Sequence, residues 1–226
     1  MDIIDRVRVP FKYDERRRVA IIEVPYDNFA RMCQREYKEV DVTFVDSRKL
    51  SDKQRRCCYA MIKAIADYNG DDVSSVKEFT KLEFWTNELY ATADTLFSLS
   101  DAPMSIVAAF QKWLARFIVA HDIPTKRPML DYIDDTSDYV YACLIHKKCP
   151  ICGMKADLHH VEAVGMGRDR DTIIHEGMKV LPLCRKHHTE IHTIGKSEFF
   201  KRYHIDDGIP ADKTICKIYG LKGKKP

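Results

Sequence analysis

The hydrophobic and polar positions of the chain change period along its length. Residues 19–24 (VAIIEV) and 39–45 (EVDVTFV) are rich in β-branched side chains, have turn-forming residues around them, and predict strands. Between them, residues 26–40 carry large apolar side chains at helical spacing and predict a helix. The first part of the chain therefore reads as strands that are followed by helices.

Longer helices are predicted over the middle of the chain. Ser51 is a candidate N-cap, and the pair Asn69-Gly70 is a typical helix stop. A second helix is predicted within residues 74–90 and a third within residues 98–124. The residues expected to face inward are Cys58, Met61, Ile62 and Ile65 in the first helix and Met104, Val107, Phe110, Leu114 and Phe117 in the third.

Pro124 and Pro128 then interrupt the pattern, and a short helix is predicted over residues 135–146. We therefore expect an α+β protein with a first domain over residues 1–125, a connecting helix over 126–145 and a second domain over 146–226. The pattern leaves open whether the connecting helix packs on the first domain or joins the two.

Composition places the chain among globular proteins. It has 226 residues, of which 45% are hydrophobic and 31% charged, enough apolar material for a packed core. No apolar run approaches the roughly 20 residues of a membrane span. The first residues, MDIIDRVRV, include acids and lack the apolar core of a signal peptide. A soluble, cytoplasmic protein without a membrane partner is expected.

The charge of the chain is unevenly distributed. The net charge is +3, but residues 146–226 hold 16 Lys and Arg against 10 Asp and Glu, so the remainder is net acidic. The chain ends in KIYGLKGKKP, which carries four lysines and no acid. A basic segment of this kind suits a polyanion, and it is equally typical of a solubilising tail.

Cysteine and histidine are concentrated in the second domain. The chain holds 8 Cys and 9 His, and nine of these 17 residues lie within residues 149–192. Cys149 and Cys152 form a CPIC turn, and Cys184 and His187 repeat the two-residue spacing in LCRKHH. Close spacing of Cys and His in an intracellular chain indicates a metal, and two such pairs predict a tetrahedral structural Zn²⁺ site.

Four further histidines surround these pairs. His159 and His160 are adjacent in DLHHVEAV, so in a strand their side chains point to opposite faces. His188 and His192 are four residues apart, which places them on one face of a helix. A site of His159, His188 and His192 with open coordination positions would suit a catalytic ion, and His160 could act as general base. Taken singly, each of them could equally be an ordinary strand or helix residue.

Taken together, CPIC, DLHHVEAV and LPLCRKHHTEIH resemble the HNH nuclease family. The resemblance covers about residues 146–204 and implies a small zinc-containing ββα-metal fold that grips DNA across one phosphodiester. It implies that His160 is the general base and that Mg²⁺ or another divalent cation is held by His159, His188 and His192. The structural zinc ligands would be Cys149, Cys152, Cys184 and His187.

One position departs from the family pattern. The family's middle asparagine usually lies five residues before the cysteine of the second pair, and Lys179 occupies that position here. The nearest asparagines, Asn28, Asn69 and Asn87, are far upstream. His175 is close in sequence and could substitute. The departure affects the expected turnover more than the expected fold.

The first domain has a resemblance of its own. Residues 47–70, the block VKEFTKLEFW and residues 97–124 resemble, in this order, the Orf (NinB) recombination proteins of lambdoid phages. The resemblance covers about residues 1–125. It implies a homodimer that binds single-stranded or branched DNA and the host single-strand-binding protein, in a bacterial host cell.

Basic residues in both domains are candidates for DNA contacts. One run surrounds the predicted start of the first long helix, where side-chain charge and the helix N-terminus both attract phosphate. The other residues lie in or beside the loop GMGRDRD. A solvated charged surface explains both groups equally well. The candidates are Arg48, Lys49, Lys53, Arg55, Arg56, Arg168, Arg170 and Arg185.

Three functions compete. The first is a phage DNA recombination protein that acts as a metal-dependent HNH endonuclease. The second is a non-catalytic recombination mediator, in which a lapsed HNH module serves only as a DNA grip. The third, a metal sensor or transcription factor built on the zinc knuckle, has no helix-turn-helix pattern to support it.

Overall fold

The computed structural model divides into two compact units, Met1–Phe44 and Val45–Pro226. Among the described residues, no helix has both the length and the apolar composition of a membrane-spanning segment. The residues that the structure describes are 9–24, 29–34, 42, 46–89, 96–133, 135–162 and 173–223.

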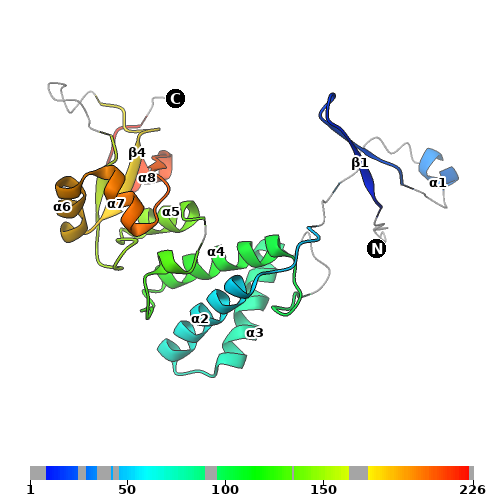
Figure 1. Cartoon of the computed structure of the whole chain (residues 1–226), viewed down its shortest axis with the longest axis horizontal. Coiled ribbons are helices and arrows are strands. Elements are labelled where there is room, and N and C mark those ends of the chain that lie inside the picture. The colour runs from blue at the N-terminus through cyan, green and yellow to red at the C-terminus, as the bar shows by residue number, and fades with distance from the viewer. Residues whose placement is uncertain are drawn as a thin grey trace. The chain divides into compact units, whose positions relative to one another are not determined.

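The first unit contains a β-hairpin. Strands β1 (Phe11–Asp14) and β2 (Val19–Ile22) pair antiparallel, and α1 (Phe29–Gln34) follows them (Figure 1). The strand predicted at 19–24 is present as β2, and α1 lies within the predicted helix. The sequence did not predict β1, because its four residues alternate too briefly to stand out beside the charged turn that follows. The strand predicted at 39–45 lies outside the described residues except for Val42.

Helix α2 (Asp52–Asn69) begins and ends where the sequence predicted. The Ser51 hydroxyl accepts a hydrogen bond from the Gln54 amide, and the Gln54 side chain accepts one from the Ser51 amide, which completes a capping box. Gly70 ends the helix in the left-handed conformation. The predicted inward residues are all buried, namely Cys58, Met61, Ile62 and Ile65.

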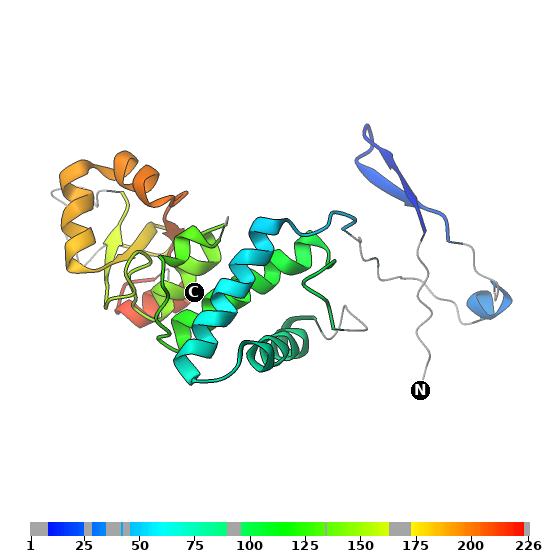
Figure 2. The ribbon, with the colours of Figure 1, turned by 60° about the horizontal axis from the view of Figure 1, so that its bottom comes forward.

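Two more helices complete this bundle. Helix α3 (Val73–Phe84) is capped by Asp72 and continues as a π-helical turn, η1 (Trp85–Leu89). Helix α4 (Met104–Ala120) packs against both α2 and α3, as Figure 2 shows. Val107, Phe110 and Leu114 are fully buried as predicted. Met104 and Phe117 are only half-buried; Met104 is the first residue of α4, and Phe117 lies at the edge of its buried face.

A 3₁₀ turn and a short helix follow the predicted proline break. These are η2 (Met129–Asp131) and α5 (Ser137–Ile145). Helix α5 packs on α4 and also on elements that come later in the chain, β4, β5 and α8. It therefore contacts both the helical bundle and the later elements. The prediction that residues 1–125 and 146–226 act as separate functional domains stays a prediction.

The C-terminal part is built on a small antiparallel sheet with the order β3–β4–β5. In it, His160 of β3 lies opposite Val180 of β4. Helix α6 follows β4 directly, and Gly195, at φ +84°, allows the sharp change of direction into α7. The elements are β3 (Asp157–His160), β4 (Lys179–Leu183), α6 (Arg185–Ile194), α7 (Lys196–Tyr203), β5 (Ile209–Pro210) and α8 (Lys213–Tyr219).

One hydrophobic core extends through the second unit. It continues from Leu114 of α4 through Leu144 of α5 to Leu181 of β4 and Phe199 of α7, all of which have no more than 2% of their surface exposed. Burial of each such side chain contributes about 1.5–3 kcal/mol. The strands and helix that carry the Cys and His residues are therefore anchored on a continuous buried core.

Candidate metal centre and active site

The first pair of cysteines lies on a tight turn after α5. The Gly153 amide donates to the Cys149 carbonyl, and the Cys149 amide donates to the Met154 carbonyl, both at 2.8 Å. Gly153 has φ +69°, a conformation that a residue with a side chain adopts at a cost. An isolated bridge between Lys148 and Lys155 closes the turn. The sequence CPICG thus forms a knuckle that directs both sulfurs to one side.

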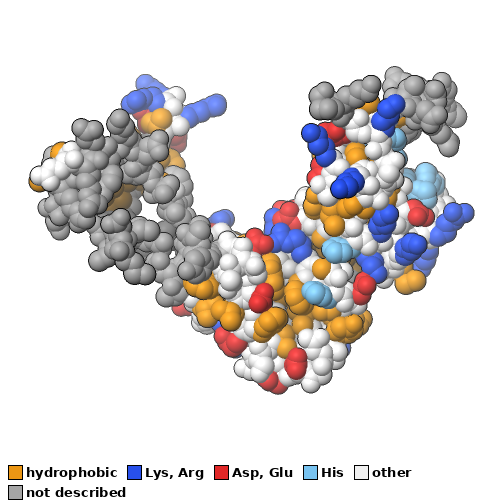
Figure 3. Space-filling model, turned by 180° about the vertical axis from the view of Figure 1, so that it is seen from behind, with side chains coloured by type: hydrophobic (Ala, Val, Ile, Leu, Met, Phe, Trp, Pro, Cys, Tyr) orange, Lys and Arg blue, Asp and Glu red, His pale blue; other side chains and the backbone are white. Residues whose placement is uncertain are grey.

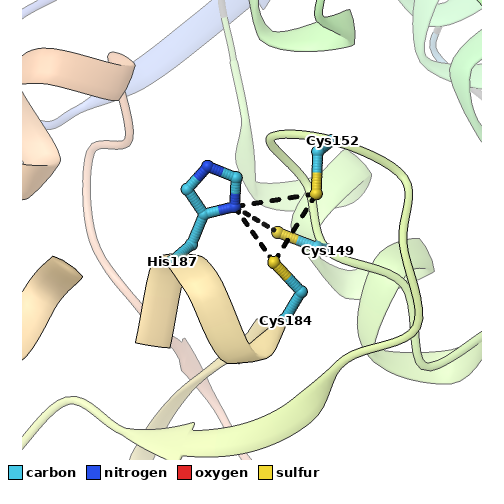
Figure 4. Close-up of side chains that lie close together, drawn as sticks. All are labelled: Cys149, Cys152, Cys184 and His187. Atoms are coloured by element: carbon cyan, nitrogen blue, oxygen red, sulfur yellow. Dashed lines mark hydrogen bonds between the residues drawn. The ribbon is translucent and has the colours of Figure 1, made fainter. Parts of the chain in front are cut away.

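The second pair lies at the start of α6 and faces the knuckle. Cys184 is the N-cap of this helix, and His187 lies in its first turn. The His187 Nδ1 atom lies 3.4 Å from the Cys149 sulfur, 3.6 Å from the Cys152 sulfur and 3.2 Å from the Cys184 sulfur (Figure 4). The sulfurs of Cys152 and Cys184 are 3.6 Å apart.

These distances fit a zinc ion. Tetrahedral ligands with Zn–S bonds of about 2.3 Å and Zn–N bonds of about 2.0 Å lie roughly 3.5–3.8 Å from one another. The four side chains of Cys149, Cys152, Cys184 and His187 form one compact group of metal-ligating atoms. Three thiols and one imidazole are also the donor types of structural zinc sites.

Burial sets the protonation of these groups when no cation faces them. It raises the pKa of the Cys149 thiol to about 12, so without a cation this thiol would stay protonated. Burial opposes ionisation of Cys184 as well, but backbone amides of His187 and Lys186 donate to its sulfur, and the pKa of Cys184 falls below its usual value. A cation is therefore needed to hold all three sulfurs as thiolates.

Residues outside the four candidate ligands support this cluster. The Tyr139 hydroxyl, buried in α5, donates to the Pro150 carbonyl at 3.0 Å and so fixes the knuckle. The Tyr203 ring packs edge-on against the His187 ring, with centroids 5.5 Å apart, and its hydroxyl donates to the Glu190 carboxylate. Sequence reasoning missed these residues, because no spacing rule connects α5 or α7 to a Cys-x-x-Cys turn.

A second cluster lies on β3 and α6. Ring centroids of His159 and His188 are 4.9 Å apart, those of His159 and His192 are 5.1 Å apart, and those of His188 and His192 are 4.9 Å apart. Their metal-ligating nitrogens all lie within 4.8 Å of one another. His159 is buried, His188 is half-buried and His192 is exposed, so the cluster opens to solvent on one side.

The environment of His159 and His188 favours their neutral forms. Burial, followed by the nearby His188 and His192, lowers the pKa of His159 to about 4. Burial, with His192 beside it, also lowers the pKa of His188. Neutral imidazole is the form that binds a metal, so near neutral pH His159 and His188 present lone pairs to a cation.

His160 points to the other side of β3. Its Nε2 atom lies 2.8 Å from Nδ1 of His175, and the two ring centroids are 4.9 Å apart. Burial, followed by the charge of His175, lowers the pKa of His160. The alternation predicted for a strand therefore separates His159 and His160 into two environments. The sequence placed His175 near the site but gave no evidence that it contacts His160.

Lys179 lies at the first residue of β4 and forms an ion pair with Asp207. That hydrogen bond lowers the pKa of Asp207. The Lys179 carbonyl accepts a hydrogen bond from the Val161 amide at 2.9 Å, which ties β4 to the residue that follows His160. Asp207 is thus the ion-pair partner of Lys179, the residue at the position where the family has asparagine. The sequence analysis did not single out Asp207.

The predicted DNA contacts have different surroundings. The Arg48 guanidinium donates two hydrogen bonds to the Asp46 carboxylate, and the Arg55 guanidinium donates to the carbonyls of Leu99 and Ser100, so both have roles within the fold. Arg168 and Arg170 lie outside the described residues. The remaining candidates are exposed, namely Lys49, Lys53, Arg56 and Arg185.

Figure 3 shows where charge gathers on one face of the molecule. Lys and Arg side chains gather on the C-terminal part, where histidines also reach the surface, whereas Asp and Glu are more frequent on the helical part. Exposed cations on α6 and α7 include Arg185, Lys186, Lys196 and Lys201. Such a surface attracts the phosphates of a nucleic acid.

Comparison with known proteins assigns the chain to a family of nucleases. Residues 26–223 match the family described as "Putative HNHc nuclease", which covers most of the chain. The chain belongs to this family. The search of the curated proteins and the search of the solved structures found no match. None of the comparisons bears on the resemblance to phage Orf (NinB) proteins.

Proposed function

We propose that the chain is a metal-dependent DNA endonuclease. The observation that carries the proposal is the arrangement around β3. The group of His159, His188 and His192 lies on one face of the strand, and His160 lies on the other. The Cys149, Cys152, Cys184 and His187 cluster holds the adjoining end of α6, as a structural zinc site would. Family membership supports DNA as the substrate.

In this proposal each group has a separate role. A divalent cation such as Mg²⁺, held by His159, His188 and His192, would supply positive charge for the scissile phosphate and the leaving oxygen. His160, neutral because of burial, takes a proton from the attacking water. Exposed cations beside the cluster, Arg185 among them, hold the flanking phosphates.

The test is cleavage of defined DNA substrates. Single-stranded, duplex and branched DNA are incubated with the zinc-loaded protein and Mg²⁺, Mn²⁺ or Zn²⁺. We expect cleavage with at least one metal and a loss of about 100-fold or more in His160→Ala, since general-base catalysis contributes about 10²–10⁴-fold. His146→Ala, an exposed histidine at the end of α5 and outside both clusters, is the matched control and keeps wild-type activity. Absence of cleavage with every metal rejects the proposal.

A second candidate is a recombination mediator that binds DNA without cutting it. The observation that favours it is Lys179, whose side chain is held by Asp207 at the family's asparagine position. It keeps the roles predicted from the resemblance to Orf proteins, including the dimer and the host single-strand-binding protein as partner. It predicts salt-sensitive binding of single-stranded DNA that His160→Ala leaves unchanged.

A further inference from the structure

The fold brings His160 and His175 into contact. The contact does not result from free rotation of two exposed side chains. Both rings are half-buried, and the 2.8 Å separation of Nε2 and Nδ1 is a hydrogen-bond distance. The contact spans 15 residues, so it depends on how β3 and the segment before β4 are packed.

The backbone around His175 is fixed on three sides. The His175 amide donates to the Lys222 carbonyl at 2.8 Å, and the His175 carbonyl accepts from the Met178 amide at 3.0 Å. The Gly177 amide donates to the Ala211 carbonyl at 2.8 Å. These bonds join the segment to Ala211, which follows β5, and to Lys222, which follows α8, so the backbone that carries the His175 side chain is held in place.

A hydrogen bond between two imidazoles couples their tautomers. One nitrogen must donate a proton and the other must accept it. If His175 Nδ1 accepts, His160 carries its proton on Nε2 and its Nδ1 has a free lone pair. If His175 Nδ1 donates, the proton of a neutral His160 is on Nδ1, and no nitrogen remains free to act as a base.

We propose that His175 is a positioning residue that holds His160 in the Nε2–H tautomer and fixes its ring, leaving Nδ1 to act as the base. This inference rests on the proposed function. In the step it serves, an O–H bond of water breaks and its proton passes to His160 Nδ1. The water oxygen forms a bond to phosphorus, the bond from phosphorus to the leaving oxygen breaks, and that oxygen takes its proton from solvent. Throughout, His160 donates through Nε2 to His175.

Two substitutions at position 175 separate the hydrogen bond from simple packing. In His175→Leu the acceptor is lost. In His175→Asn the side-chain oxygen occupies about the same place as Nδ1, since both atoms are three bonds from the Cα atom, and it can accept the same proton. Loss of the hydrogen-bond partner that orients a metal-ligating histidine typically costs about 10–100-fold, and we expect an effect of the same size for an oriented base.

The experiment measures kcat and KM for cleavage of the best DNA substrate by the full chain. We expect His175→Leu to lower kcat about 10–100-fold with little change in KM, and His175→Asn to restore most of it. His146→Leu is the matched control, with zinc content and thermal unfolding followed in every variant. Nitrogen-15 NMR of the His160 ring gives a second readout. The wild type shows the Nε2–H tautomer and His175→Leu a mixture.

Three results overturn the inference. One is a folded His175→Leu variant that cuts DNA at the wild-type rate. Another is a His175→Asn variant as slow as His175→Leu, which would assign the loss to packing. The third is an unchanged His160 tautomer in His175→Leu. If the wild-type protein cuts no DNA with any metal, the proposed function itself fails, and the positioning role fails with it.

Discussion

At the scale of single residues, the two clusters of candidate metal ligands differ in how far the protein encloses them. The four residues of the Cys149, Cys152, Cys184 and His187 cluster lie at the distances that zinc ligands require, and buried Tyr139 supports the turn behind them. The three histidines of the second cluster include half-buried His188 and exposed His192, so this cluster opens to solvent. A closed site beside an open one is the arrangement expected of a structural ion next to a catalytic one.

We predict that replacing Lys179 lowers the stability of the fold only slightly and hardly affects the action of His160 as general base. The side chains of Lys179 and Asp207 are both about 40% exposed, so solvent screens their ion pair and Lys179→Met should lower the free energy of unfolding only slightly. Cleavage should stay within a few-fold of wild type, because His175 and not Lys179 contacts His160. Urea unfolding and a cleavage assay of the same preparation check both expectations.

The effect of pH on the stabilisation by this ion pair follows from the direction of the pKa shift of Asp207. The hydrogen bond from Lys179 lowers the pKa of Asp207, so the folded state holds this proton less tightly than the unfolded state. The stabilisation is present above the usual carboxyl pKa of about 4 and is lost as the pH falls through the lowered value. The difference between Lys179→Met and the wild type should therefore disappear in acid; a difference that grows in acid would contradict the assignment.

Much of the candidate site could be predicted from spacing alone. Cys-x-x-Cys and Cys-x-x-His pairs, and histidines four apart on a helix, are local patterns, and the fold brings each predicted set together. The contacts of His175, Tyr203 and Asp207 could not be predicted in this way. Each depends on how distant segments pack around β4 and α6, and no sequence period encodes that packing.

At the scale of elements, agreement with the sequence follows the strength of the local signal. Helix α2 has a capping box at one end and a left-handed glycine at the other, and both of its ends were predicted. Strands β1 and β5 were not predicted, since with four and two residues they are too short for an alternation to stand out. Short strands of this kind are formed by their partners rather than by their own sequence.

The cap of α2 offers a direct test at this scale. Ser51→Ala removes the hydroxyl that accepts from the Gln54 amide and should lower the free energy of unfolding by about 1 kcal/mol. Ser74→Ala, in the first turn of α3, is the matched control and should change it by less than about 0.5 kcal/mol, because the cap of that helix is Asp72. Equal effects of the two substitutions in urea unfolding would show that Ser51 is not the cap.

At the scale of the whole molecule, the residues from Val45 onward form one compact unit that contains both the helical bundle and the metal clusters. Helix α5 connects them, because it packs on α4 and on β4 and supplies Tyr139 to the knuckle. Ion pairs from Lys112 of α4 to Asp135 and Asp138 add to this connection. The position of the candidate site therefore depends on the helical core as well as on its own ligands.

The central claim is that the chain holds one tightly bound structural ion and one exchangeable ion. Counting the bound metals tests it most directly. Zinc-loaded protein is dialysed against Mn²⁺ and its metals are counted by mass spectrometry. For the wild type and the His146→Ala control, we expect about one zinc and about one manganese per chain. In His192→Ala, zinc should remain and manganese should be lost. A wild-type chain that keeps zinc but binds no manganese, or a His192→Ala chain that binds both, would contradict the account.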